Sequence, residues 1–290
     1  MKRTLLAAVF SAFLAYGLAA GASAAWWAED GYVTGSAGLT SNSITLFSTV
    51  STGVVAGANV SYYSNSAPYN KRMYSFRMPV MYSAHNFYVS LKPFVYPVSP
   101  STHSGAAGGK LSLLTSLGEE SEDSYLHLTV SGAWARQRAL LDLGGGPASE
   151  SFSESALELA AEKSFFNQFF FQASAAAFLE SGKAKNTNMI TPALDHSDLA
   201  SMGTFLPVTD MPEWVLTAQV ARDMKPEYDS HLYAGYSKIS FRQGRAANSA
   251  VAGIKLSLNE KITMDLAYNA YKADSSRWKN YYKMFLQVFF

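Results

Sequence analysis

The four consecutive residues Asp195-His196-Ser197-Asp198 are the densest group of reactive side chains in the sequence. A serine, a histidine and a carboxylate are the parts of a nucleophilic hydrolase, and histidine with carboxylates also binds metal ions. Consecutive loop residues rarely point at one centre, however, and no second histidine lies near this group. The sequence therefore favours a polar surface loop, or a lid that folds into an interior, over a catalytic or metal site.

His127 and Ser131 form a second candidate pair, because they lie on the same face of a predicted strand, Ser124–Ala135. The two residues are four positions apart in the sequence, which separates them too far along a strand for direct proton transfer. The chain has no cysteine, which excludes thiol catalysis and thiolate metal sites. We therefore predict no catalytic residue, no bound metal and no cofactor.

The elements that would position these side chains are short segments of alternating polarity. Side chains alternate between the two faces of a strand, so such a segment has one apolar and one polar face. In Met73–Tyr82, aromatic and apolar side chains alternate with Ser75 and Arg77. The last ten residues follow the same rule, with five apolar or aromatic side chains on one face, namely Tyr282, Met284, Leu286, Val288 and Phe290.

About fourteen such segments follow one another, each long enough to cross a bilayer as a tilted strand. Twelve is the alternative, because the glycine-rich stretch Ile44–Tyr63 is weakly patterned. Thr40-Ser41-Asn42-Ser43 is predicted to be the first turn, and Pro79 and Pro93 interrupt two strands without an evident reason. Long polar connections alternate with short turns, and the long ones are Ser64–Arg72, Pro97–Gly108, Arg136–Ser149 and Ser181–Pro212.

Composition and the N-terminus point to export. Only 16% of the 290 residues are charged and 14% are aromatic, whereas about a quarter of a soluble domain is charged. The formal net charge of +1 gives no reason to expect nucleic-acid binding. Residues 1–24 read as a cleavable signal peptide, with basic Lys2 and Arg3, the apolar stretch Leu5–Leu18 and the small residues before position 25.

The final strand resembles the C-terminal strand of bacterial outer-membrane β-barrel proteins, which ends in phenylalanine and is read by the barrel-assembly machinery. The whole chain resembles porin-like outer-membrane barrels as a class, on generic features and without the motif of a specific family. This resemblance implies an all-β, antiparallel, up-and-down transmembrane barrel over residues 25–290 after a signal peptide over 1–24. A soluble β-sandwich or jelly roll is the alternative fold.

The resemblance also implies a location in the outer membrane of a Gram-negative bacterium, with membrane lipid and the assembly machinery as partners. The apolar face of the last strand would then be the assembly signal, and that strand would pair with Gly31–Thr40 to close the barrel. Aromatic residues near strand ends, such as Tyr74, Trp134 and Tyr282, fit the belts at the two membrane interfaces.

If the apolar register faces lipid, the polar register lines a lumen. We hypothesise that an acidic wall at Glu154 and Glu158 faces a more basic wall at Lys255 and Lys283; the alternative is local charge pairing, for example of Lys255 with Asp265. The candidate pore-lining residues are Arg77, Lys92, Lys110, Glu154, Glu158, Gln168, Gln172, Thr217, Gln219, Lys255, Asp265 and Lys283.

The predicted function is an outer-membrane pore for passive passage of ions or small polar solutes, with Ser181–Pro212 as a constriction loop. Two alternatives stay open. One is a structural or adhesive barrel whose lumen is filled, and the other is an outer-membrane hydrolase that uses His127 or His196. The inward aromatic residues Tyr88, Phe94 and Tyr96 would suit a sugar-stacking track.

Deletion of Phe290 tests the assembly signal. We expect the deletion variant to be secreted but to assemble poorly, because the terminal aromatic side chain of the recognised strand is lost. The measurement is the fraction of heat-modifiable, folded protein in outer-membrane preparations. A normal folded fraction in the variant would contradict the assignment.

Overall fold

The structure is a computed structural model that describes residues 25–65, 71–99, 103–117, 125–165, 168–181, 184, 188–191, 193–225, 230–274 and 276–290. The predicted signal peptide, residues 1–24, lies outside the described residues. In the described part of the chain, none of the helices has the length and apolar character needed to cross a membrane.

Nearly all of the regular structure is β-strand. In the described part of the chain, the strands are accompanied by the single-turn 3-10 helices η1 (Ser36–Gly38), η3 (His196–Asp198) and η4 (Arg242–Gly244). The strands are β1 (Trp26–Gly35), β2 (Leu39–Ser51), β3 (Val54–Asn65), β4 (Lys71–Arg77), β5 (Val80–Ala84), β6 (Phe87–Tyr96), β7 (Gly105–Leu117), β8 (Leu126–Asp142), β9 (Pro147–Phe165), β10 (Phe169–Glu180), β11 (Asn188–Met189), β12 (Pro212–Lys225), β13 (Ser230–Phe241), β14 (Ala246–Asn259), β15 (Ile262–Ala273) and β16 (Lys279–Phe289).

These strands form a closed antiparallel barrel of fourteen strands, as the sequence predicted. Strands β4 and β5 together occupy one position in the wall between β3 and β6, and the two-residue β11 pairs only with the edge of β8. Strand β16 closes the ring by pairing with β1, from Trp27 opposite Phe289 to Gly35 opposite Tyr281. Closure gives every wall strand two neighbours, which removes the unpaired edges that lipid cannot satisfy.

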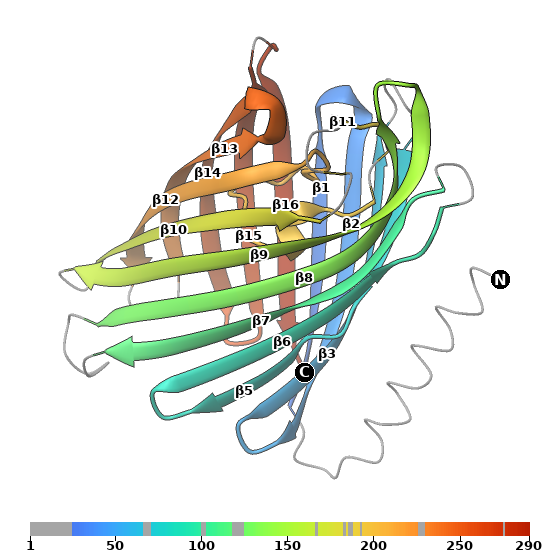
Figure 1. Cartoon of the computed structure of the whole chain (residues 1–290). Coiled ribbons are helices and arrows are strands. Elements are labelled where there is room, and N and C mark those ends of the chain that lie inside the picture. Colours follow the sequence, from blue (N-terminus) through green and yellow to red (C-terminus); the bar gives the residue numbers. More distant parts are fainter. Residues whose placement is uncertain are drawn as a thin grey trace.

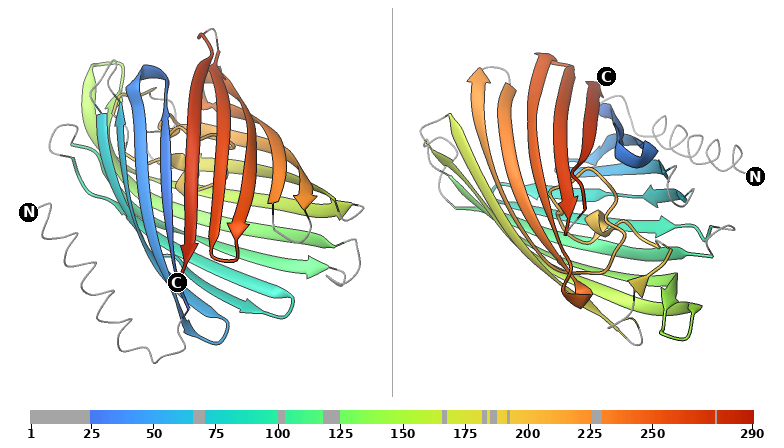
Figure 2. Two further views of the ribbon diagram at one scale, coloured as in Figure 1. Left: turned by 180° about the vertical axis from the view of Figure 1, so that it is seen from behind. Right: turned by 90° about the horizontal axis from the view of Figure 1, so that it is seen from above.

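The barrel wall is not uniform in tilt. Strands β1–β3 and β14–β16 stand steeply, whereas β6–β10 cross the wall at a much stronger slant (Figure 1, Figure 2). The longest strands are on the slanted side, with 17 residues in β8 and 19 in β9. The first and last strands lie side by side, and the amide of Phe290 donates to the carbonyl of Trp26 at 2.9 Å.

Alternating polarity along the strands places apolar side chains outside. On β8, Leu128, Val130 and Trp134 are exposed on the outer face, while Ser131 and Gln137 are buried on the inner face. Tyr74, Tyr82, Trp134, Tyr268, Trp278 and Tyr282 belong to the large exposed apolar or aromatic side chains. On β16, Tyr282, Met284 and Leu286 are exposed, and Tyr281 is buried. The register that the sequence predicted to face lipid is thus the outer face.

The first turn lies four positions earlier than the sequence predicted. Strand β1 ends at Gly35, and η1 makes the turn with Ala37 and Gly38 in the left-handed region at φ values of 61° and 64°. The predicted turn residues 40–43 lie within β2 instead. Their short polar side chains resemble a turn sequence because they lie near the rim, where both faces tolerate polarity. The last strand therefore pairs with Trp26–Gly35 and not with Gly31–Thr40.

Pro79 and Pro93 meet at one place in the wall, which accounts for the break between β4 and β5. The Met78 amide donates to the Pro93 carbonyl at 3.1 Å, and the Gly57 amide donates to the Pro79 carbonyl at 2.8 Å. In a hydrogen-bonded antiparallel pair each residue normally both donates and accepts. Each proline lacks its donor, so each pair keeps one bond and the regular ladder stops over two positions.

The prediction of a loop over Arg136–Ser149 is wrong, because most of these residues are in strands. Strands β8 and β9 continue as a hairpin until Asp142 and Pro147, so that only Leu143–Gly146 form the turn. The glycine-rich run and neighbouring polar residues resembled a long loop. Inward-facing Ala139 and Leu141 explain the extension, because both are fully buried under the connection between β10 and β12.

Two glycines on the same strand pair make a matched stability test. A Cβ at Gly108 would lie 2.7 Å from the Cα of Ala135, whereas a Cβ at Gly132 would meet nothing within 4 Å. We expect Gly108→Ala to lower the free energy of unfolding by about 1–3 kcal/mol through overpacking of β7 against β8. Gly132→Ala should leave it unchanged or slightly raised. Urea unfolding in detergent micelles measures both, and equal effects would contradict the packing.

Candidate functional site

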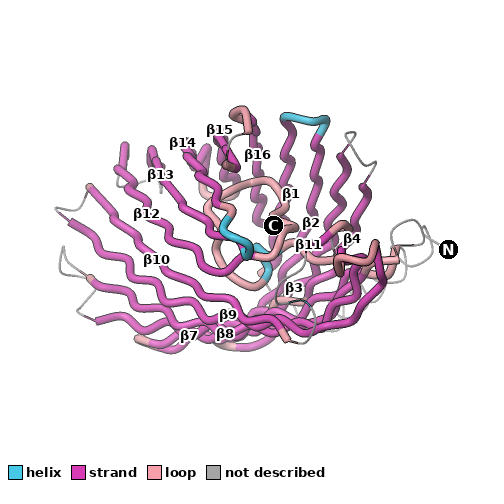
Figure 3. The backbone as a smooth tube through the Cα atoms, turned by 45° about the horizontal axis from the view of Figure 1, so that its top comes forward, coloured by secondary structure: helices cyan, strands magenta, loops and turns pink. Residues whose placement is uncertain are grey.

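The connection between β10 and β12 folds into the barrel. Strands β10 and β12 are direct neighbours, paired from Phe169 opposite Arg222 to Ala177 opposite Trp214. The described residues 193–211, here called the inward segment, lie within the ring of strands (Figure 3). The predicted connection Ser181–Pro212 thus has the right position, and its described part is a lid folded into the interior.

The inward segment is held partly by apolar packing. Its side chains at Leu194, Leu199 and Met202 are almost fully buried and belong to the same cluster as the inward-facing Phe178 and Ile239 of the wall. Apolar residues on the wall's inner face would otherwise contact water. Their burial supplies a hydrophobic driving force for the segment to enter the barrel.

Arg77 provides the most extensively bonded polar anchor. Its guanidinium donates to both carboxylate oxygens of Asp198, at 2.6 and 2.8 Å, which is the bidentate geometry of a strong ion pair. The remaining donors contact Asn59 at 2.9 Å, Ser61 at 2.7 Å and Tyr96 at 3.0 Å. The fixed fork of arginine is therefore satisfied on every side, and it joins η3 to three wall strands.

Two further groups contact the same carboxylate. The Tyr96 hydroxyl donates to Asp198 Oδ2, and the Lys92 ammonium lies 3.5 Å from Asp198 Oδ1. Burial alone raises the pKa of Asp198, but the charges of Arg77 and Lys92 outweigh that effect and hold the pKa below its usual value. Asp198 is thus a buried anion surrounded by two cations and a hydroxyl.

His196 and Glu154 form a second, fully buried anchor. The His196 ring contacts the Val208 carbonyl through Nδ1 at 2.7 Å and Glu154 Oε2 through Nε2 at 2.8 Å. A carbonyl and an ionised carboxylate both only accept, so with Glu154 ionised both ring nitrogens carry protons and the ring is cationic. Complete burial lowers the pKa of His196, but the Glu154 charge and the hydrogen bonds outweigh it and raise the pKa to about 9. Gln137 donates to the same Glu154 oxygen.

Smaller contacts hold the rest of the inward segment. Glu158 accepts from the Ser201 amide at 3.0 Å and pairs with Lys110 at 2.6 Å. On the other side, Asn269 accepts from the Thr204 hydroxyl at 2.9 Å. Gly203 has a φ of 58° and passes so close to Ser237 that a Cβ would overlap its hydroxyl. The segment therefore contacts opposite parts of the wall.

Two cavities flank the inward segment. One, of about 480 Å³, is lined by residues of β1–β4 and β6 together with η3, and it includes Arg77, Lys92 and Asp198. The other, of about 370 Å³, is lined by β12–β16 and includes Lys255 and Asp265. Thr204, Phe205 and Lys283 line both cavities, so this part of the segment separates them.

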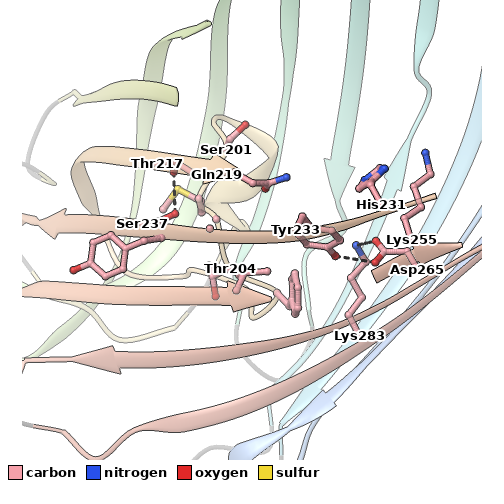
Figure 4. A pocket seen from close by; sticks show the side chains of 16 residues that line it. Ser201, Thr204, Thr217, Gln219, His231, Tyr233, Ser237, Lys255, Asp265 and Lys283 are labelled. Atoms are coloured by element: carbon pink, nitrogen blue, oxygen red, sulfur yellow. Dashed lines mark hydrogen bonds and ion pairs between the residues drawn. The ribbon is translucent and has the colours of Figure 1, made fainter. Parts of the chain in front are cut away.

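The smaller cavity contains a local charge cluster (Figure 4). Asp265 accepts from the Lys283 ammonium at 2.6 Å and from the Tyr233 hydroxyl at 2.7 Å. Lys255 is opposite Asp265 in the β14–β15 register and opposite His231 in the β13–β14 register. The Lys283 ammonium also lies over the Phe205 ring, 5.3 Å from its centre. One carboxylate, two lysines and a histidine therefore line this cavity.

The predicted pore-lining residues fall into distinct groups. Arg77, Lys92, Lys110, Glu154 and Glu158 contact the inward segment or its anchors. Thr217, Gln219, Lys255, Asp265 and Lys283 line the smaller cavity. Gln172 lies on the polar register of β10 and is exposed, whereas Gln168 is a turn residue before β10, because β9 continues to Phe165.

Charged residues of the two predicted opposing walls form ion pairs with nearby side chains. Glu158 pairs with Lys110, Glu154 with His196, and Asp265 with Lys283. The expected partners Lys255 and Asp265 lie opposite each other in the β14–β15 register, and Asp265 forms an ion pair with Lys283 at 2.6 Å. This arrangement corresponds to the local-pairing alternative more closely than to a field across the lumen.

The Asp195-His196-Ser197-Asp198 group does not converge on one centre. Asp195 accepts from the amides of Ser197 and Val208, at 3.1 and 3.2 Å, while Asp198 and His196 face different parts of the wall. Both His196 nitrogens are occupied, so neither is open to a serine hydroxyl. In the described residues no three His, Cys, Asp or Glu side chains are placed to hold a metal ion.

The other candidates from the sequence are also placed by the structure. Ser131 donates to Ser112 at 2.9 Å, and His127 Nδ1 lies 3.7 Å from Glu162. Phe94 and Tyr96 are buried beneath the inward segment and so offer no open ring faces for sugar stacking. Sequence reasoning missed Asn59, Ser61, Gln137 and Asn269 as anchoring residues; their only signal was a polar side chain on the inward register.

Loss of charge on His196 should loosen the inward segment. Its pKa of about 9 lies above the value of about 6.5 in an unfolded chain, so its stabilisation is complete below pH 6.5 and disappears as the pH rises through 9. We expect the free energy of unfolding to fall by up to about 3 kcal/mol over that range. Urea unfolding at pH 6 and 9.5 measures it. His196→Gln should remove this pH dependence, and an equal dependence in that variant would contradict the assignment.

No protein-family model matches the sequence, and no curated protein matches it either. Solved structures do match the fold. OprB of Pseudomonas putida aligns with a TM-score of 0.50 at 8% identity over 92% of this chain and 94% of its own. CdiB from Acinetobacter baumannii aligns with a TM-score of 0.51 at 10% identity over 91% of this chain and 60% of its own.

A loop-deletion mutant of OmpT, an outer-membrane protein of Vibrio cholerae, aligns at a TM-score of 0.47 and 10% identity over 92% of this chain and 99% of its own. At such identities the similarity concerns the fold alone. In fold, the chain resembles bacterial outer-membrane β-barrel proteins.

Proposed function

We propose that this chain is an outer-membrane channel for passive passage of ions or small polar solutes. The observation that carries the proposal is the pair of polar cavities, of about 480 and 370 Å³, on either side of the inward segment within a closed barrel. A channel needs lining groups that can replace the water around a solute, and polar side chains on the inner face of the wall contribute to the lining of both cavities.

The inward segment would act as the constriction. It narrows the lumen from one side to the other, and Phe205 with Lys283 lies where the two cavities meet. Local ion pairs neutralise most of the wall charge, so a passing solute would meet fixed dipoles and paired charges in place of a strong field. We infer that the channel discriminates weakly among small neutral solutes and more strongly among charged ones.

The outer face supports the membrane location. Large exposed apolar side chains such as Leu157, Leu159 and Leu216 point away from the lumen and would contact lipid. Export by the signal peptide over residues 1–24, and insertion by the barrel-assembly machinery through the outward face of β16, belong to this proposal.

A non-transporting barrel is the second candidate, because the inward segment itself is an argument for it. The segment's buried apolar side chains and two buried ion pairs fill part of the lumen as a stable plug. We propose no catalytic function, since both nitrogens of His196 are engaged and Ser131 donates to Ser112.

Conductance across a planar bilayer separates the two candidates. Purified, refolded wild type should give discrete conductance steps. A variant in which residues 185–209 are replaced by a short Gly-Ser linker should conduct several-fold more, because β10 and β12 stay paired while the lumen opens. Liposome swelling with neutral sugars provides the solute assay.

The outcomes are distinct. Conductance only in the shortened variant would favour the plugged barrel, and silence of both proteins would remove the channel proposal. A matched control is Gly132→Ala, which adds a methyl group where no atom lies within 4 Å and should conduct as the wild type does.

A further inference from the structure

We propose that Arg77, Lys92 and Tyr96 form a binding site for the carboxylate group of a small organic acid, and that Asp198 occupies this site in the absence of such a solute. The inference rests on the proposed channel function and names a class of solute for it. The Asp198 carboxylate then serves as an internal competitor carried by the inward segment.

The geometry around Asp198 is that of a ligand site. Arg77 donates to both carboxylate oxygens at 2.6 and 2.8 Å, Tyr96 donates to one of them, and Lys92 lies 3.5 Å from the other. The planar fork of arginine matches a carboxylate in two parallel hydrogen bonds. All three groups belong to wall strands, so the site does not depend on the inward segment for its shape.

Second contacts hold the site in place without Asp198. Arg77 also donates to Asn59 at 2.9 Å and to Ser61 at 2.7 Å, on the neighbouring strand β3. Its guanidinium therefore keeps its orientation when the carboxylate is exchanged. A binding group that is already oriented loses little conformational entropy when a ligand arrives.

The site opens on water-accessible space. Arg77, Lys92 and Asp198 line the cavity of about 480 Å³, and the Lys92 side chain is 36% exposed there. A solute carboxylate entering the cavity can reach Lys92 first and then exchange with Asp198 on Arg77. Asp195 also lines this cavity, and its Oδ1 atom accepts from the backbone amides of Ser197 and Val208.

Exchange would release one attachment of the inward segment and leave others. The His196–Glu154 pair and the contact of Ser201 with Glu158 do not involve Arg77. The segment would therefore shift at η3 while it stays tethered in the lumen. Carboxylate binding and widening of the larger cavity are coupled in this way, because Asp198 and the solute cannot occupy Arg77 together.

Acetate binding to the refolded full chain tests the proposal, with saturation-transfer NMR on the acetate methyl signal as a readout that does not need conduction. Asp198→Asn should bind acetate about tenfold more tightly than wild type, because the charged internal competitor is gone. Asp142→Asn, a matched acid-to-amide change at the exposed turn of the β8–β9 hairpin, should bind as wild type does. Lys92→Met should weaken acetate binding both in wild type and in Asp198→Asn, because it removes one cation of the site and keeps Arg77.

Equal acetate affinities in wild type, Asp198→Asn and Asp142→Asn would overturn the proposal. Heat modifiability confirms that each variant is folded before binding is compared. If wild type conducts but no variant binds acetate, the channel proposal stands and the proposal of a carboxylate site is wrong. If acetate binding depends on Asp198 and Lys92 but the protein does not conduct, the proposal of a carboxylate site stands and the channel proposal is wrong.

Discussion

A strand in a membrane wall has hydrogen-bond partners for its backbone only if another strand lies on each side of it. Lipid offers no donor or acceptor, so each unpaired group there costs several kcal/mol by general estimates. The pairing of β1 with β16 meets this requirement for the whole chain. Pro79 and Pro93 interrupt the regular pairing between β4 and β5, and the carbonyl of each proline still accepts one hydrogen bond across the strands.

Ring closure also creates the environment in which the polar interior is useful. Side chains that alternate inward from successive strands meet across a small lumen, and the inward segment supplies partners for them. Asp198 neutralises Arg77, and Glu154 and His196 neutralise each other without exposure to water. Leaving one member of such a pair alone is costly, about 3–5 kcal/mol in comparable buried pairs. The lumen and its segment are therefore mutually dependent.

The barrel could be predicted from the sequence because the alternation of polar and apolar side chains is a pattern within each single strand. A period of two fixes which side chains face out, and the alternation in Met73–Tyr82 or Tyr281–Phe290 is visible without knowing any partner strand. Predictions from the local pattern were wrong where both faces of a strand are polar, as at residues 40–43. They were also wrong where glycines made a strand extension look like a loop, as in the hairpin before Pro147.

The candidate site could be predicted only in part. The inward direction of Arg77, Lys92 and Glu154 followed from alternation, but their partners did not. Arg77 and Asp198 are 121 positions apart, and their contact depends on how a long connection enters a closed ring. The cluster at residues 195–198 attracted attention for its catalytic residue types, whereas the structure uses those same types as anchors. Side-chain chemistry alone does not distinguish these roles.

The connection that contains the inward segment begins at the end of β10 and ends at the start of β12. These two strands are hydrogen-bonded to each other, from Phe169 opposite Arg222 to Ala177 opposite Trp214. The backbone pairing of the wall therefore does not need the segment, although the buried charges on the inner face of the wall do. Exchanges of this stretch that keep partners for Arg77 and Glu154 can alter what the lumen admits while the strand pairing stays constant. Such independence makes the connection between β10 and β12 the part of the chain best suited to evolutionary or engineered change in permeability.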